Sequence, residues 1–189
     1  MRKHIPHERF NDRVNFFYEG KHIPEWGSEN KDDAWGKENS DNADTACAVA
    51  IDKKGNLACA TSTRGIAGKR KGRVSGAALV GCGGYANDKG AAATTGHGEK
   101  LIKLTLARQV VIEMENGRNA QEATEEAVKL LTEKLKGHGG AIAIDKNGNF
   151  GKAFSTPLMA WASVKDDQLK DGFEKDEEGN AKLLYNERF

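Results

Sequence analysis

The sequence predicts an α+β fold in which helices cover a mainly antiparallel sheet. Two short apolar runs, each followed by Asp-Lys-x-Gly-Asn, lie at residues 48–56 and 141–149 and predict two hairpins. Between them, residues 99–135 carry apolar side chains at the three-and-four spacing that is typical of helices. Strands, then helices, then strands again favour helices layered on one sheet.

Each element follows from its own signal. In both hairpins the turn glycine, Gly55 or Gly148, can take the positive φ that a tight turn needs. Residues 99–116 predict one long buried helix that Gly117 ends. A second long helix begins at Asn119, whose side chain forms a capping box with Glu122, and ends at Gly137. After residue 164 we expect one short strand and a loose tail.

The composition of the chain excludes several classes of protein. The chain has 189 residues and a formal net charge of +1, so nothing global suggests binding to nucleic acid or to an anionic membrane. No apolar run reaches the length of a membrane helix, and the N-terminus lacks a signal-peptide core, so we expect a cytoplasmic protein. Cys47, Cys59 and Cys82 lack metal-site spacing and are expected to be free thiols.

We expect the chain to divide into three parts. Residues 1–44 are polar and read as a linker, residues 45–173 form the main domain, and residues 174–189 form a charged tail. One domain with appendages is therefore expected.

Four features of the main domain could carry chemistry, and each also has an ordinary explanation. Asp44-Thr45 lies where a strand begins. Residues 64–73 hold five cations, which form either a solvated loop or a site where one arginine grips a carboxylate. The glycines at 81–84 lack nucleotide-binding spacing and favour close chain approach. Residues 94–99 open a helix, where the amides either cap it or hold an anion.

The order of these features resembles the β-subunit of plant-type L-asparaginases, also called isoaspartyl peptidases. The likeness covers roughly residues 44–173. It is carried by residues 45–52, 60–65, 72–74, 81–86 and 94–99, and it extends through residues 106–108 and 159–166. That family belongs to the N-terminal nucleophile (Ntn) hydrolases, which fold as αββα sandwiches and cut their own precursors. The resemblance implies the β-subunit half of such a sandwich, with two hairpins and two long helices.

The resemblance also implies a role for each matching residue. Self-cleavage between Asp44 and Thr45 would free Thr45, whose hydroxyl attacks a side-chain amide or isopeptide carbonyl while its own amine acts as the base. Thr63 would hold the Thr45 hydroxyl. Thr95 and Gly96 would stabilise the oxyanion. The implied substrate-binding residues are Arg73, Gly76, Thr95, Gly96 and Gly98. Asparagine and β-aspartyl dipeptides are the implied substrates, and we expect no cofactor and no metal.

Two departures from the family pattern matter. Gly76 stands where the family usually has the aspartate that pairs with the substrate α-ammonium group. One alternative is therefore a threonine aspartase-like protease, whose peptide substrates have no free α-amine. Only 44 residues precede Thr45, whereas family precursors carry well over a hundred. We therefore expect a homo-oligomer or pairing with an α-subunit-like chain. The alternative is a non-catalytic truncated paralogue that acts as a pairing partner.

Overall fold

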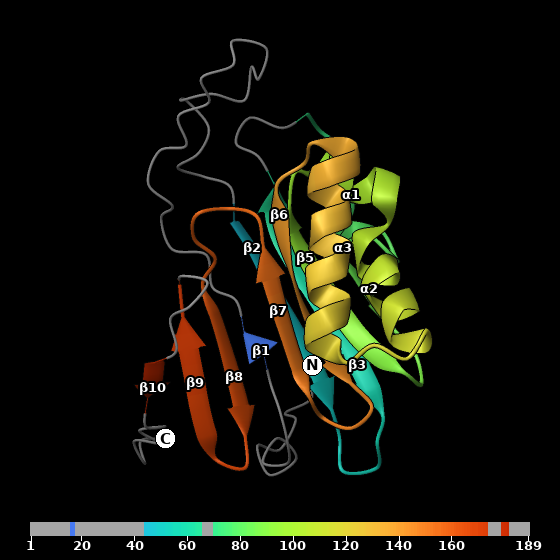
Figure 1. The fold of residues 1–189 in the computed structure, drawn as a ribbon. Helices are drawn as coiled ribbons and strands as arrows, with labels where there is room; N and C mark the ends of the chain where they lie inside the picture. The colour runs from blue at the N-terminus through green and yellow to red at the C-terminus, as the bar shows by residue number, and fades with distance from the viewer. Residues whose placement is uncertain (1–15, 18–43, 66–69, 174–178, 182–189) are drawn as a thin grey trace, which may run out of the picture.

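The computed structural model describes residues 16–17, 44–65, 70–173 and 179–181. Helices lie on one face of a central four-stranded sheet, a two-stranded sheet lies on its other face, and a second four-stranded sheet completes the described fold (Figure 1). All paired strands that the structure describes are antiparallel. The α+β prediction is therefore confirmed.

The central sheet has the order β4-β5-β6-β7. Its strands are β4 (Gly84–Ala86), β5 (Gly90–Gly96), β6 (Gly139–Asp145) and β7 (Phe150–Phe154). Strands β5 and β6 are almost fully buried because both of their faces are covered. Side chains alternate between the faces of a strand, and Ala92 accordingly packs in the helical core while Ala91 and Ala93 pack in the core on the opposite face.

The helical layer differs from the prediction of two long helices. It contains α1 (Gly98–Leu104), α2 (Leu106–Glu115) and α3 (Ala120–Leu135). The first expected helix breaks at Thr105, whose φ is 48°. The amide of Arg108, which would donate to residue 104 in a continuous helix, donates instead to the carbonyl of Gly81 at 2.9 Å. A contact from a distant glycine turn therefore divides the helix.

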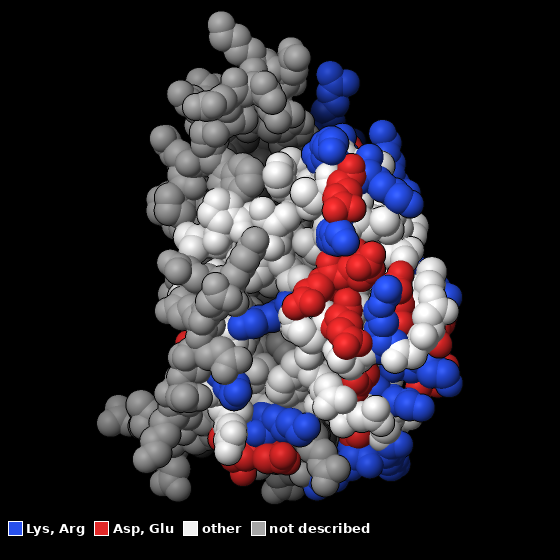
Figure 2. All heavy atoms as spheres, in the orientation of Figure 1, with Lys and Arg blue, Asp and Glu red and all other residues white. Residues whose placement is uncertain are grey.

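The ends of the helices follow local chemistry. Asn119 and Glu122 form the expected capping box at the start of α3, and Gly117 has the expected positive φ of 96°. The end of α3 was predicted one residue late, because Lys136 rather than Gly137 takes the left-handed conformation, with φ of 49°. Acidic and basic side chains are interspersed over the helices (Figure 2), which is typical of a solvated face.

The first predicted hairpin is confirmed as β2 (Asp44–Ile51) and β3 (Leu57–Gly65). The second predicted hairpin is confirmed as β6 and β7. Cys47, Val49 and Ile51 of β2 pack against Ala91 and Ala93 of the central sheet. This packing forms the second hydrophobic core.

The remaining sheet has the order β1-β8-β9-β10. Its strands are β1 (Phe16–Phe17), β8 (Trp161–Lys165), β9 (Gln168–Gly172) and β10 (Gly179–Ala181). Within residues 165–189, the described residues thus form two strands after β8, where one is expected, because β10 adds to the edge of β9. Most of the expected linker and tail lies outside the described residues. Among the described helices, none combines the length and the apolar character that a membrane crossing requires.

Candidate functional site

The expected nucleophile lies at the start of β2. Thr45 is half-buried and pairs directly with Thr63 across the hairpin. The Thr45 hydroxyl donates to Thr63 Oγ1 at 3.1 Å, and the amide of Gly65 donates to the same oxygen at 2.9 Å. Thr63 is therefore held by its own strand while it contacts Thr45, so the two hydroxyls lie in a fixed geometry.

The strand ladder is irregular at the peptide bond between Asp44 and Thr45. Thr45 pairs with Thr63, but Asp44 pairs with Gly65, so two steps along β3 oppose one step along β2. A register shift of this kind bends the strand and redirects its side chains. The irregularity therefore falls on the bond that the sequence analysis marked for self-cleavage.

Thr95 lies on the face of β5 that looks toward β2. Its neighbour Thr94 points to the helical side, where its hydroxyl donates to the Cys82 carbonyl at 2.6 Å. Alternation then directs Thr95 to the same face as Ala91 and Ala93. Thr95 and Cys47 also line one small cavity.

The end of β5 and the start of β2 lie together across the two layers. Cys47 Sγ lies 3.5 Å from the carbonyl oxygen of Thr94, to which it donates. Thr45 is two residues before Cys47 and therefore faces the same layer. Thr45, Thr63 and Thr95 thus all face the space between the two sheets at one end of the strands.

Gly96 takes a conformation that other residues rarely adopt. Its φ is 134°, and a Cβ at this position would lie 2.4 Å from the Cα of Gly139 on β6. The next residue continues this tight pairing, because the His97 amide donates to the His138 carbonyl at 2.9 Å. Only glycine fits between β5 and α1 at this point, which fixes the direction of the chain directly after Thr95.

The predicted substrate residues gather beside the start of α1. Gly76 and Gly98 lie next to each other, because a Cβ at Gly98 would lie 3.9 Å from the Gly76 amide nitrogen. Arg73 Nη2 forms an ion pair with Glu99 Oε1 at 3.2 Å. The sequence analysis did not single out Glu99 as a functional residue, although its motif includes this acid one residue after Gly98.

Cys82 is a second residue that sequence reasoning missed. A Cβ at Gly76 would lie 2.8 Å from Cys82 Sγ, so this sulfur fills the space where a side chain at position 76 would begin. The glycines that follow Cys82 do allow close approach, as expected, because a Cβ at Gly83 would lie 2.5 Å from Ala77.

The cysteines carry no disulfide and are not set up as nucleophiles. All of them are free, and Cys47 and Cys82 are buried. Burial raises the pKa of Cys47 and of Cys82 from the usual 9.0 to about 11, and it also raises the pKa of Cys59. Thiols with raised pKa values are poor nucleophiles at neutral pH. In the part of the chain that the structure describes, no three His, Cys, Asp or Glu side chains gather as a metal site.

Comparison with known proteins identifies relatives of this chain. Residues 11–174 match the family described as asparaginase. The chain is 47% identical over 129 residues to an isoaspartyl peptidase/L-asparaginase of Xenopus laevis, and the match covers 68% of this chain and 42% of that protein. It is 42% identical over 137 residues to an isoaspartyl peptidase/L-asparaginase of Homo sapiens, with 72% and 44% covered.

A more distant relative gives the same result. A probable isoaspartyl peptidase/L-asparaginase of Drosophila pseudoobscura pseudoobscura is 37% identical over 135 residues, with 70% of this chain and 42% of that protein covered. The chain therefore spans about two fifths of the length of the curated relatives it matches. Because the family match includes most of the chain and the whole of the described site around Thr45, the chain belongs to the asparaginase family.

Proposed function

We propose that this chain is an asparaginase or β-aspartyl (isoaspartyl) peptidase that uses Thr45 as an N-terminal nucleophile. The observation that carries the proposal is the 3.1 Å hydrogen bond between the Thr45 and Thr63 hydroxyls, placed beside an irregular Asp44–Thr45 step. In the uncut chain the Thr45 nitrogen is an amide and cannot accept a proton. Cleavage before Thr45 turns it into an amine beside its own hydroxyl, which is the pairing of nucleophile and base that acyl transfer needs.

The proposed reaction has two steps. The Thr45 oxygen attacks the side-chain carbonyl carbon of the substrate, and the hydroxyl proton passes to the Thr45 amine. That proton then moves to the departing nitrogen, which leaves as ammonia or as the amine of a peptide, and an ester to Thr45 remains. Water attacks the ester and releases aspartate, which restores the Thr45 hydroxyl.

Thr95 and Gly96 are proposed to stabilise the oxyanion of both steps. Donors that are already fixed in place stabilise a developing negative charge without reorganising during the reaction. The tight contact of Gly96 with Gly139 supports this role, because it holds the strand end in one conformation.

Arg73 is proposed to bind the substrate α-carboxylate, since a guanidinium group matches a carboxylate in geometry and charge. Gly76 and Gly98 lie together beside it, and they leave the α-ammonium group of the substrate without a carboxylate partner at position 76. Free asparagine should therefore bind more weakly than it would to a site with an aspartate there.

A partner is proposed for the outer face of the β2–β3 hairpin. The inward side chains of β2 are Cys47, Val49 and Ile51, and the alternate outward positions are alanines. A strand that faces only water usually alternates apolar with polar residues. We therefore propose that this outer face packs against a further layer, supplied by a second copy or by an α-subunit-like chain. The free thiols fit the cytoplasmic location that we also propose.

Self-cleavage tests the central proposal. The expressed chain of 20.5 kDa should convert into two fragments, the larger of which begins at Thr45 by N-terminal sequencing. The variant Thr45→Ala lacks the hydroxyl and should stay intact under the same conditions, whereas Thr45→Ser should still be cut. The cut protein should hydrolyse β-aspartyl dipeptides. A parent chain that stays intact, alone and with a co-expressed family member, would refute the proposal.

A further inference from the structure

Arg73 is tied to the start of α1 by one acidic side chain. Its Nη2 atom lies 3.2 Å from Glu99 Oε1, although the two residues are 26 positions apart in the sequence. Glu99 stands in the first turn of α1 and follows Gly96 by three positions. The ion pair therefore links the loop that carries Arg73 to the segment that carries Thr95 and Gly96.

The contact engages only part of the guanidinium group. An arginine has five N–H donors in a planar fork, and the hydrogen bond to Glu99 runs from Nη2 to a single carboxylate oxygen. A substrate carboxylate can take the remaining donors while Glu99 keeps its own. The pair is also partly exposed, with 35% of the Arg73 side chain and 54% of the Glu99 side chain accessible, so it contributes little to stability.

The loop around Arg73 makes a second approach to the same segment. Gly76, three residues after Arg73, lies against Gly98, one residue before Glu99. Two neighbouring contacts thus align this loop with the start of α1. Of the two, the Arg73–Glu99 pair is the one that sets the direction of the guanidinium group.

We propose that Glu99 is a positioning residue that orients Arg73 toward the α-carboxylate of the substrate. The proposal rests on the function proposed above. Glu99 acts through Arg73 and does not itself contact the substrate, so its effect is confined to ligands that carry the α-carboxylate. A misplaced binding group weakens the interactions that it makes itself, so ligands without an α-carboxylate should be affected least.

Binding of the product to the cut protein tests the proposal. L-aspartate carries the α-carboxylate, whereas β-alanine keeps the amine and the side-chain carboxylate but lacks it. In Glu99→Ala we expect the Kd of L-aspartate, measured by calorimetry, to rise about tenfold, and in Glu99→Gln by about threefold because an acceptor oxygen remains. The Kd of β-alanine should stay within about twofold in both variants.

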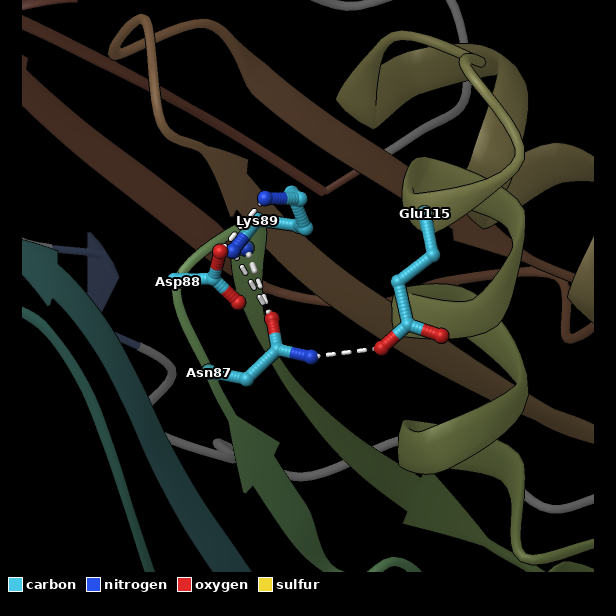
Figure 3. A network of polar contacts seen from close by, with 5 residues as sticks. Asn87, Asp88, Lys89 and Glu115 are labelled. Carbon is cyan, nitrogen blue, oxygen red and sulfur yellow. Dashed lines mark hydrogen bonds and ion pairs between the residues drawn. The ribbon is translucent and has the colours of Figure 1, made fainter.

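Glu115 supplies a matched control. It pairs with Arg108 at 3.1 Å and is likewise partly exposed, but it lies at the far end of α2, where it accepts from Asn87 Nδ2 at 2.6 Å (Figure 3). Glu115→Ala and Glu115→Gln break a glutamate–arginine pair of the same kind outside the site. Both variants should bind L-aspartate as the parent does.

Each other outcome has one meaning. Tighter binding of L-aspartate by Glu99→Ala would show that Glu99 competes with the substrate, and unchanged binding would show that it does not orient Arg73; either overturns the inference alone. Equal weakening of L-aspartate and β-alanine would mean that Glu99 shapes the whole site, which also overturns it. A parent protein that is cut but neither binds L-aspartate nor hydrolyses β-aspartyl dipeptides would instead refute the proposed function, and the inference would fall with it.

Discussion

The position of one sulfur atom controls the space at Gly76. Cys82 is buried, with 1% of its surface exposed, and its Sγ lies 2.8 Å from where a Cβ at Gly76 would stand. No real Cβ tolerates that distance, so a larger residue at 76 forces Cys82 to move. A side chain at position 76 and the Cys82 sulfur compete for the same space, so a test of substrate binding at this position must change both residues.

Restoring the aspartate gives the first prediction at this scale. Gly76→Asp alone should lower the free energy of unfolding by about 1 to 3 kcal/mol, because it overpacks against Cys82. Combined with Cys82→Ala, which makes room, it should lower the KM of asparagine about tenfold by supplying a charged partner for the α-ammonium group. The measurement is the KM of asparagine in the double variant, with Cys82→Ala alone as the control. An unchanged KM would show that position 76 does not face the α-ammonium group.

The buried thiols make stability depend on pH. The pKa of Cys47 and of Cys82 is raised to about 11 in the folded chain, against 9.0 for an ordinary thiol. Between these values the unfolded chain has lost protons that the folded chain keeps, so the free energy of unfolding must fall as pH rises. Each thiol contributes a slope of up to about 1.4 kcal/mol per pH unit.

Urea unfolding across this pH range tests the second prediction. The parent should lose stability steadily above about pH 9, and Cys47→Ala with Cys82→Ala should show a shallower slope. The two proteins differ only at Cys47 and Cys82, so the difference between the slopes isolates these two thiols. Parallel slopes would mean that the cysteines are not protected from ionisation.

At the scale of elements, the two hairpin turns are chemically alike but differ in burial. Asp52 Oδ1 accepts from the amides of Lys54 and Asn56, both at 2.8 Å. Asp145 Oδ1 accepts from the amides of Asn147 and Asn149, at 2.8 and 3.0 Å. In each turn the terminal asparagine also donates its side chain to the aspartate. Asp52 is exposed, whereas Asp145 retains only 5% of its surface.

This difference predicts unequal losses from one substitution. Asp145→Ala removes three hydrogen bonds that a buried carboxylate accepts, and it should lower the free energy of unfolding by about 2 to 3 kcal/mol. Asp52→Ala removes the same bonds where water can replace them, and its loss should be much smaller. Chemical denaturation of both variants gives the comparison. Equal losses would indicate that the turn chemistry, rather than its burial, sets the contribution.

The hairpins could be predicted from the sequence because every signal they need is local. A glycine with positive φ follows an aspartate within each turn, and the apolar runs flank it. The break at Thr105 could not, because it depends on the carbonyl of Gly81, which lies 27 positions before Arg108. Apolar periodicity continues across residue 105 and gives no sign of this contact.

The site shows the same division between local and distant causes. The motif around Thr45 and the motif around Thr95 are each continuous in the sequence, and the resemblance to a family indicated them together. The pair of Arg73 with Glu99 and the contact of Gly76 with Cys82 depend on how a loop packs against α1 and on the turn that follows it. Residue spacing alone does not encode those distances.

At the scale of the molecule, the two layers that cover the central sheet have different outer surfaces. The helices cover one side with a charged outer surface (Figure 2). On the other side the β2–β3 hairpin packs inward through its larger apolar residues. Its outward residues are small, namely the alanines Ala46, Ala48, Ala50, Ala58 and Ala60 together with Ser62. Small side chains suit close packing of another layer and give little reason for a face to remain in water.

Charge placed on this face tests whether it binds a partner. Ala58 and Ala60 are exposed on β3, so Ala58→Glu with Ala60→Glu should leave the fold of the chain intact. Burying two unpaired carboxylates in an interface is strongly unfavourable, and the variant should therefore lose its association with a second copy or with a co-expressed family member, as measured by light scattering. Lys129→Glu, which changes an exposed charge on α3, should associate as the parent does. If the glutamates leave the assembly unchanged while the circular dichroism spectrum stays that of the parent, the outer face of β2–β3 is not the surface that binds a partner.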